Sequence, residues 1–145
     1  MIFGRVVAGY LDANPHVFED FDMIIPSPTF IGAEAGTTDH TAEVLRRARV
    51  EDDSWPYRFD IMSKTRKTDR LAGIRAFKDR AILAETQIGP ALRVDKPKAV
   101  AGKAVLVYDD VFTDGLTLRE VARKLNTAGA RLVAGLALAR QPFRM

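Results

Sequence analysis

The sequence predicts one α/β domain, built on an open, mostly parallel twisted sheet that is flanked by helices. Strand-like segments alternate with segments of helical periodicity through the 145 residues, as is typical of parallel sheets. Residues 104–108 are apolar at every position, as in a central strand that is covered on both faces. A helix-periodic segment follows, and Gly129 stands where a helix commonly ends in a left-handed residue.

The N-terminal segment predicts a helix and then a short strand. Apolar residues recur at helical spacing over residues 3–11. Residues 23–25 form a short apolar run, which we interpret as a buried strand. Residues 26–28 read Pro-Ser-Pro and must leave the ladder, since proline cannot donate to it. Gly32 and Gly36 then predict a mobile or tightly turned loop.

A second helix and a second strand are predicted next. Residues 41–48 carry an apolar stripe at helical spacing, and Thr38 or Asp39 can serve as the N-cap. Residues 57–62 alternate between apolar and polar side chains, which predicts a half-buried strand.

The middle of the chain has weaker patterns. After a basic loop, Leu71, Ile74 and Phe77 predict a helix. Residues 91–94 have strand character, and residues 96–98, Lys-Pro-Lys, predict a turn.

The last third is the clearest part of the pattern. Apolar residues of 118–125 fall on one helix face, and residues 131–138 are rich in Leu, Val and Ala, as in a final strand. Neither an internal repeat nor a linker interrupts the chain, so residues 1–145 are predicted to form a single domain.

The composition excludes several classes of site. The chain contains no cysteine, which rules out disulfide scaffolds, thiolate zinc sites, iron–sulfur clusters and cysteine nucleophiles. Its only histidines, His16 and His40, are too few to favour a histidine metal site. No apolar run approaches the ~20 residues of a membrane span, and the N-terminus lacks the pattern of a secretory signal. We therefore expect a cytoplasmic protein without a membrane partner.

Positive charge is concentrated in one stretch, although the formal net charge is only +3. Residues 63–80 contain seven lysines and arginines against two aspartates, a local excess of five. Such a stretch suits a polyanion, either a nucleic-acid backbone or a small polyphosphate. A solvent-facing helix surface explains the same charges, and the sequence leaves both interpretations open.

The turn after the predicted central strand offers the groups for a binding site. In an open parallel sheet, ligands bind at the carboxyl ends of the strands, where Asp109 and Asp110 stand. Free N–H groups at the start of the next helix favour an anion, to which Thr113 and Thr117 add hydroxyls and Gly115 allows close approach. The two carboxylates suit sugar hydroxyls or a hydrated magnesium ion. This order predicts a site for a phosphate beside a ribose diol; the alternative is an acidic turn that only caps the helix.

The thirteen residues 105–117 read Val-Leu-Val-Tyr-Asp-Asp-Val-Phe-Thr-Asp-Gly-Leu-Thr and resemble the phosphoribosyl-pyrophosphate signature of type I phosphoribosyltransferases. That signature has several apolar residues, two acidic residues, an apolar pair and a Thr-x-Gly-x-Thr loop. The resemblance implies a pentosyltransferase that takes phosphoribosyl pyrophosphate with Mg²⁺, passes phosphoribose to an acceptor and releases pyrophosphate. Other phosphate motifs fit less well, since the chain has neither a Gly-Lys-Ser/Thr loop nor a Gly-x-Gly-x-x-Gly pattern.

The resemblance also implies a role for each residue of the motif. Asp109 and Asp110 are the catalytic pair, which holds the ribose hydroxyls directly or through the metal ion. The loop after them holds the 5′-phosphate of phosphoribosyl pyrophosphate or of a nucleoside monophosphate. The substrate-binding residues of this loop are Val111, Phe112, Thr113, Asp114, Gly115, Leu116 and Thr117.

Two further segments correspond to the pyrophosphate side of the family's site. Pro26 and Ser27 stand where family members cradle pyrophosphate with backbone N–H groups, although the prolines here remove two donors. One or more of Lys64, Arg66 and Lys67 is expected to reach the pyrophosphate from a mobile loop.

Outside the signature, the chain is most similar to the ComF-type, or competence-factor, group. The likeness rests on an N-terminal helix ahead of residues 22–28 and on the Arg-Lys-Thr segment within residues 66–71. The cysteine-rich zinc ribbon that often precedes this core is missing. The resemblance implies a minimal hood at residues 1–21 and a core at residues 22–145.

The sequence leaves the acceptor and the partners open. An enzyme with an unidentified acceptor is the first hypothesis, and a non-catalytic sensor of nucleotides or phosphoribosyl pyrophosphate is the second. The third is a ComF-like accessory protein of DNA uptake, whose basic segment meets single-stranded DNA. We also expect a homodimer, mainly from the family resemblance and in part from an exposed region at Trp55 and Tyr57.

Overall fold

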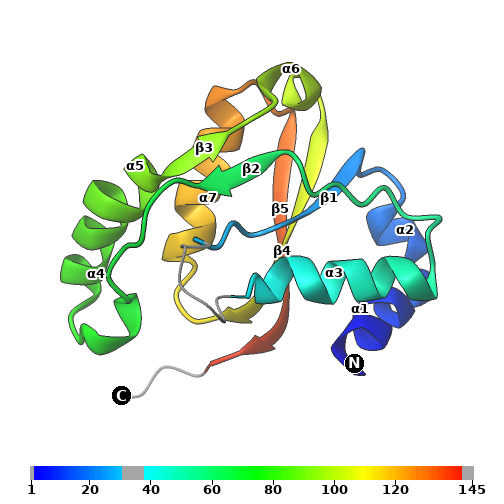
Figure 1. Cartoon of the computed structure of the whole chain (residues 1–145), viewed down its shortest axis with the longest axis horizontal. Helices are drawn as coiled ribbons and strands as arrows, with labels where there is room; N and C mark the ends of the chain where they lie inside the picture. The colour runs from blue at the N-terminus through cyan, green and yellow to red at the C-terminus, as the bar shows by residue number, and fades with distance from the viewer. Residues whose placement is uncertain (1, 31–37, 142–145) are drawn as a thin grey trace.

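A three-stranded parallel sheet forms the centre of the computed structural model, which describes residues 2–30 and 38–141 (Figure 1). Strand β4 (Ala104–Phe112) lies between β1 (Met23–Pro26) and β5 (Leu132–Arg140) and runs parallel to both. The central position of β4 explains its unbroken apolar run. The predicted α/β class with a mostly parallel sheet is confirmed.

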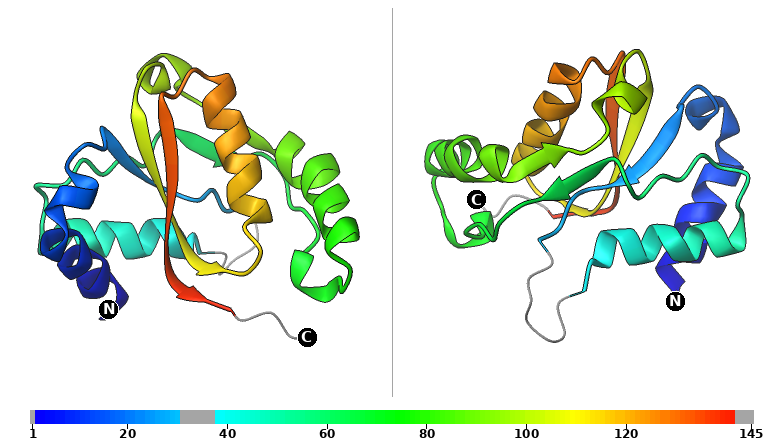
Figure 2. Two further views of the ribbon diagram at one scale, coloured as in Figure 1. Left: turned by 180° about the vertical axis from the view of Figure 1, so that it is seen from behind. Right: turned by 45° about the horizontal axis from the view of Figure 1, so that its top comes forward.

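One face of this sheet is covered by α7 (Leu116–Thr127), as Figure 2 shows. Val121 and Leu125 of α7 pack in one buried cluster with Val105 and Val107 of β4. Alternate residues of a strand point to opposite faces, so Leu106, which lies between Val105 and Val107, contributes to a different cluster.

The opposite face is covered by α1 (Ile2–Ala13) and α3 (His40–Glu51). Leu11 of α1 and Leu45 of α3 pack there with Leu106 of β4, and all three side chains are buried. Helices on both faces therefore exclude water from β4 along most of its length.

The N-terminal helices belong to the same buried cluster as β4. Gly4 of α1 lies so close to α3 that a Cβ atom at this position would stand 2.5 Å from the Cβ of Arg47. Phe18, from the short helix α2 (Pro15–Phe18), is buried in this cluster as well. Residues 2–21 thus share their packing with the rest of the described chain, and the role of residues 1–21 as a hood stays a prediction.

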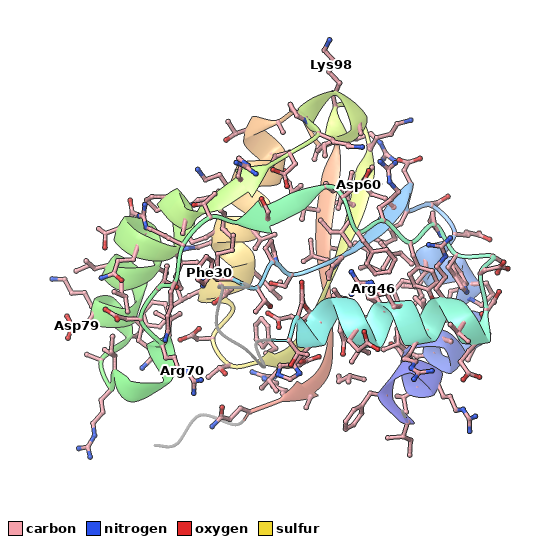
Figure 3. All side chains as sticks on the ribbon, viewed as in Figure 1. Phe30, Arg46, Asp60, Arg70, Asp79 and Lys98 are labelled. Carbon is pink, nitrogen blue, oxygen red and sulfur yellow. The ribbon has the colours of Figure 1, made fainter. Side chains whose placement is uncertain are left out.

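A smaller antiparallel sheet of β2 (Met62–Lys64) and β3 (Leu92–Val94) is separate from the parallel one. The chain between β2 and β3 forms short helical segments, namely the 3₁₀ turn η1 (Leu71–Gly73), α4 (Phe77–Leu83), the π-helical η2 (Ala84–Ile88) and α5 (Gly89–Ala91). Charged side chains such as Arg70 and Asp79 project from it into solvent (Figure 3). After β3, α6 (Pro97–Val100) leads to β4.

The predicted strand at residues 57–62 is wrong for most of its length. Tyr57 forms an isolated bridge to Ile24, and the regular pairing of β2 begins only at the last residue of the predicted run. Between these points the chain bends, and Arg58 donates to both carboxylate oxygens of Asp60 at 2.9 and 3.0 Å. A bend held by this ion pair interrupts the alternation.

The helix expected to bear Leu71, Ile74 and Phe77 is interrupted. The segment η1 is a single 3₁₀ turn, and α4 begins only at Phe77, whose side chain is exposed. The turn expected at residues 96–98 instead leads into α6, because Pro97 is well suited to the first position of a helix.

Two predicted helix ends are confirmed. Oδ1 of Asp39 accepts the backbone N–H of Ala42 at 3.1 Å and so caps α3. Gly129, just beyond α7, has a φ of +92°. The loop glycines Gly32 and Gly36 lie outside the described residues. In the part of the chain that is described, no helix has the length and apolar character needed to cross a membrane.

Candidate functional site

The carboxyl end of β1 lies beside the middle of β4 and meets the start of α3. The N–H of Ser27, the first residue after β1, donates to the carbonyl oxygen of Tyr108 at 2.7 Å. The carbonyl oxygen of Ser27 accepts from the hydroxyl of Thr41, in the first turn of α3, at 2.8 Å. Ser27 is buried, and it links the end of β1 to β4 and to this helix.

Asp109 and Asp110 lie on β4 itself. The strand continues to Phe112 because β5 continues beside it, with Val111 paired to Ala139. Both aspartates are therefore half-buried strand residues, and the prediction that they stand in the turn after the strand is wrong. They nevertheless stand toward the carboxyl end of the central strand, where parallel sheets bind ligands.

Hydrogen bonds hold the two carboxyl groups in place. The hydroxyl of Tyr108 donates to Oδ1 of Asp110 at 2.8 Å, and the backbone N–H of Asp110 donates to Oδ1 of Asp109 at 2.8 Å. The side chain of Ser27 also hydrogen-bonds to the Asp109 carboxyl. Because an ionised carboxylate has about four acceptor positions, each aspartate keeps capacity for a ligand.

Burial raises the pKa of Asp109 to about 6, and the neighbouring charge of Asp110 adds to this effect. The backbone N–H of Asp110 and the side chain of Ser27 act in the opposite direction. A cation against the ionised carboxylate would lower the pKa again, because it stabilises the charged form. Asp109 is therefore a costly charge in the free protein and a favourable one in a complex with a cation.

The raised pKa predicts a pH-dependent stability. The contribution of the Asp109 proton to folding is complete below its ordinary pKa of 3.8 and is lost as the pH rises through about 6. The loss amounts to about 2–3 kcal/mol at neutral pH. Asp109→Asn should therefore gain stability relative to the wild type between about pH 4 and pH 7. Chemical denaturation at several pH values measures this difference, and a difference that is constant with pH would contradict the raised pKa.

The loop between β4 and α7 has features of an anion site. Gly115 has a φ of +77°, a left-handed conformation that favours glycine, and α7 begins at the next residue. Oδ1 of Asp114 accepts the N–H of Leu116 at 3.2 Å. The other N–H groups of the first turn have no acceptor within the helix. Thr113 is exposed and Thr117 half-buried at the two ends of this loop.

Sequence reasoning missed one partner of this loop, which is Arg80 on α4. Its Nε donates to Oδ2 of Asp114 at 2.8 Å, and the two side chains are only 14% and 7% exposed. Figures 1 and 2 both show α4 beside the start of α7. The two residues are 34 positions apart, so no local pattern could have signalled the pair.

The residues expected on the pyrophosphate side differ in their surroundings. Pro26 ends β1 and the N–H of Ser27 is engaged in the sheet, so neither offers a backbone donor to a ligand. Lys64 ends β2, and burial lowers its pKa. Arg66 and Lys67 are exposed in the loop that follows. Within the described residues, none of these three basic side chains forms an ion pair.

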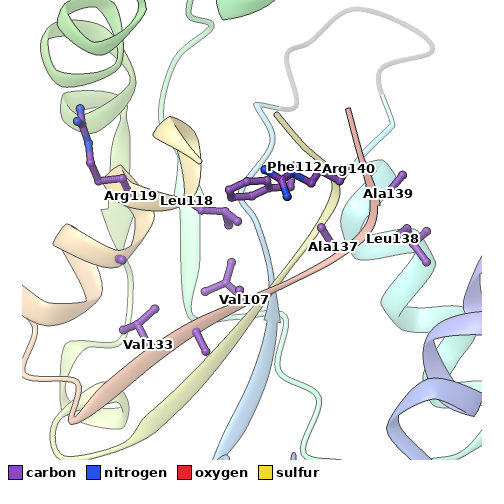
Figure 4. A pocket seen from close by; sticks show the side chains of 12 residues that line it. Val107, Phe112, Leu118, Arg119, Val133, Ala137, Leu138, Ala139 and Arg140 are labelled. Carbon is purple, nitrogen blue, oxygen red and sulfur yellow. The ribbon is translucent and has the colours of Figure 1, made fainter. Parts of the chain in front are cut away.

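An open, mostly apolar groove of about 540 Å³ runs between α7 and β5 (Figure 4). Val107 and Leu118 line it, and Phe112 and Arg140 stand together at one end. Phe112 is also the side chain nearest to Gly115, so the groove begins beside the loop. Such a lining suits an aromatic or aliphatic group.

Solved phosphoribosyltransferases have a similar architecture. A hypoxanthine-guanine phosphoribosyltransferase from Bacillus anthracis matches with a TM-score of 0.54 and 14% sequence identity, over 97% of this chain and 67% of that chain. A hypoxanthine phosphoribosyltransferase from Staphylococcus aureus matches with a TM-score of 0.56 and 12% identity, over 97% of this chain and 64% of that chain. No protein-family model matches, and no curated protein does.

At these identities, the likeness concerns the fold. It agrees with the order of elements around β4, in which a parallel central strand leads through a short loop into a covering helix. The chain therefore has the α/β fold seen in solved phosphoribosyltransferases.

Proposed function

We propose that this protein binds phosphoribosyl pyrophosphate with Mg²⁺ and transfers phosphoribose to an acceptor, releasing pyrophosphate. The observation that carries the proposal is the order of Asp109 and Asp110 at the end of β4, the left-handed Gly115, and the N-terminus of α7. This order agrees with the type I phosphoribosyltransferase signature, in a chain with that fold. A turn that only capped a helix would need neither adjacent carboxylate.

In this proposal, the loop of residues 113–117 holds the 5′-phosphate. The free N–H groups of the first turn of α7 donate to the phosphate oxygens, and the positive end of the helix dipole favours the anion. The hydroxyls of Thr113 and Thr117 add two donors. Asp109 and Asp110 accept hydrogen bonds from the ribose hydroxyls, which fixes the sugar relative to its phosphate.

The two aspartates fit a magnesium ion that is shared with the substrate. Mg²⁺ keeps several waters and is usually bound by one or two carboxylates together with substrate phosphates. Asp109 and Asp110 provide two carboxylates, and the described residues contain no group of three or more metal-ligating acids or histidines. When bound, the ion would neutralise charge on the departing pyrophosphate.

The chain's own residues mainly position the reacting groups. An electron pair of the acceptor forms a bond to the anomeric carbon while the bond from that carbon to the pyrophosphate oxygen breaks, and pyrophosphate leaves with the bonding electrons. A protonated acceptor gives its proton to solvent. Holding the ribose in the reactive geometry lowers the entropic cost of this step. Lys64, Arg66 and Lys67 would balance the charge of the leaving group.

Ligand-dependent melting and pyrophosphate release test the proposal together. Phosphoribosyl pyrophosphate with Mg²⁺ should raise the melting temperature, because a ligand of the native state stabilises it. A panel of nucleobases and amines should then contain an acceptor that supports pyrophosphate release. Stabilisation without release for any acceptor would favour the sensor hypothesis. No melting shift at millimolar ligand would contradict the proposal.

We also propose that the chain resembles the ComF-type group, on the basis of its N-terminal helix ahead of residues 22–28 and of the Arg-Lys-Thr segment within residues 66–71. The basic residues of 63–80 are then a candidate surface for nucleic acid. Many cations of this segment are exposed, as a surface for single-stranded DNA requires. DNA binding that falls steeply with salt, in a protein that does not bind phosphoribosyl pyrophosphate, would favour a DNA-uptake role.

A homodimer forms part of the same proposal, although the exposure expected at Tyr57 is wrong. Tyr57 is only 7% exposed, and the indole N–H of Trp55 donates to Asp12 at 2.7 Å. The exposed large apolar residues of α1 are Ile2, Phe3, Val6 and Tyr10. We propose this face as the contact between two copies. Light scattering should give twice the chain mass of 16.1 kDa, and Val6→Lys should give the monomer.

A further inference from the structure

The loop of residues 113–117, which we call the phosphate loop, contains a carboxylate, and a carboxylate is unfavourable beside a phosphate. Asp114 stands in the middle of the loop, and its Oδ1 accepts the N–H of Leu116 at 3.2 Å. An uncompensated negative charge at this position would repel the phosphate and weaken the attraction of the helix N-terminus. If the loop binds phosphate, the charge of Asp114 has to be neutralised from within the protein.

Arg80 supplies the neutralising charge. Its Nε lies 2.8 Å from Oδ2 of Asp114, and both side chains are largely withdrawn from solvent. A pair in this environment is screened weakly by water and salt, so its effect on the local charge is large. One carboxylate oxygen of Asp114 therefore accepts the loop N–H of Leu116, and the other oxygen pairs with Arg80.

The Arg80 guanidinium is itself fixed by the backbone. Nη1 donates to the carbonyl oxygens of Ile74 and Arg75 at 2.9 and 2.6 Å. The ring of Phe77 lies below the same group, with its centroid 5.8 Å from Cζ. The position of the positive charge is thus set before any ligand arrives, and the chain before α4 is tied to the phosphate loop.

We propose that Arg80 is a positioning residue of the phosphate site. By neutralising and orienting Asp114, it allows the loop of residues 113–117 to accept the 5′-phosphate. This inference rests on the proposed function, since it assigns a role within the same site. Arg80 acts through Asp114, and the phosphate itself is bound by the loop.

Binding of ribose 5-phosphate to the full chain tests the role by calorimetry. Arg80→Gln should raise the Kd by about tenfold or more, because it leaves the Asp114 carboxylate unpaired. Asp114→Asn removes the charge that Arg80 neutralises, so its Kd is the reference for the double variant. The double variant Arg80→Gln/Asp114→Asn should fall within about threefold of Asp114→Asn, since the two residues act as one unit. Arg80→Lys, which keeps the charge, should recover much of the affinity lost in Arg80→Gln.

Arg58→Gln is the matched control, because Arg58 pairs with Asp60 at 2.9 Å and lies outside the proposed site. It should leave the Kd unchanged. If Arg80→Gln fails to fold, the comparison of Asp114→Asn with the double variant still decides, since the proposal requires their Kd values to agree within about threefold. A double variant that binds more than about threefold more weakly than Asp114→Asn would overturn the role through Asp114. Wild-type affinity in a folded Arg80→Gln would also overturn it. A wild type that does not bind ribose 5-phosphate overturns the proposed function together with this inference.

Discussion

Asparagine at both Asp109 and Asp110 is expected to raise the melting temperature of the free protein and to weaken its binding of phosphoribosyl pyrophosphate. Each asparagine keeps the side-chain size and an oxygen that can accept the present bonds, from the Tyr108 hydroxyl and from the backbone N–H. The two charges are lost, and one of them is costly in the fold because the pKa of Asp109 is about 6. Binding should weaken by about 1–3 kcal/mol for each charged hydrogen bond that is lost.

Asp52 and Asp53 are a second pair of acids, and they provide a matched control for this variant. They are also adjacent in sequence, but they lie at the end of α3. Asp52 accepts the backbone N–H of Ser54 at 2.9 Å, and this bond lowers its pKa. Asparagine at both control positions should not raise the melting temperature and should leave ligand affinity unchanged. Equal affinities of the Asp109/Asp110 variant and the wild type would show that the ribose site lies elsewhere.

Replacing Gly115 is expected to have the largest combined effect on stability and binding. A side chain at a φ of +77° costs about 1–2 kcal/mol. An added Cβ would also stand 2.9 Å from Cε2 of Phe112, so the ring has to move. Gly115→Ala should lower the melting temperature and abolish binding of phosphoribosyl pyrophosphate, and Gly115→Val should do both more severely.

Gly102 separates the cost of a positive φ from the cost of the contact with Phe112. It has a similar φ of +73°, but a Cβ there would meet no heavy atom within 4 Å. Gly102→Ala should therefore lose only the stability that a left-handed backbone costs a residue with a side chain. It should keep full ligand affinity. Phe112→Leu in the Gly115→Ala background should restore part of the lost stability, because it removes the ring. Equal melting temperatures for Gly102→Ala and Gly115→Ala would contradict a steric role of Phe112.

Periodicity in the sequence predicted the elements that pack directly on the parallel sheet. The helix α7 is buried on one side, and the strand β4 is buried on both. Burial imposes a regular pattern of apolar residues on each of them. The chain from residue 57 to residue 65 instead follows long-range backbone bonds, and the helical segments between residues 71 and 91 are short. Examples of these bonds are the N–H of Arg58 to the oxygen of Ile24 and the N–H of Thr65 to the oxygen of Ala91. Such bonds leave no periodic signal, so the predictions there were less accurate.

The candidate site likewise contains some residues that the sequence could identify and some contacts that it could not. The loop residues are consecutive and could be identified from their order alone. The contact of Ser27 with Asp109, and that of Arg80 with Asp114, depend on segments that meet only in the folded chain. The raised pKa of Asp109 also depends on tertiary structure, since it results from burial that includes pairing with β5. Sequence order therefore suggested which groups belong to the site but not their charge state.

The outer strand β5 has a consequence for how this protein behaves at high concentration. Within the described chain, Leu132–Arg140 pairs with β4 along one side only, and its first eight residues carry no charge. The other side offers a row of free backbone donors and acceptors to any extended polypeptide. Arg131 and Arg140 flank this row, and charged residues beside an apolar strand oppose its pairing with other chains. Strand-by-strand aggregation is thus the physical hazard built into the architecture, and a lysine at the exposed Ala139 is the substitution best placed to suppress it.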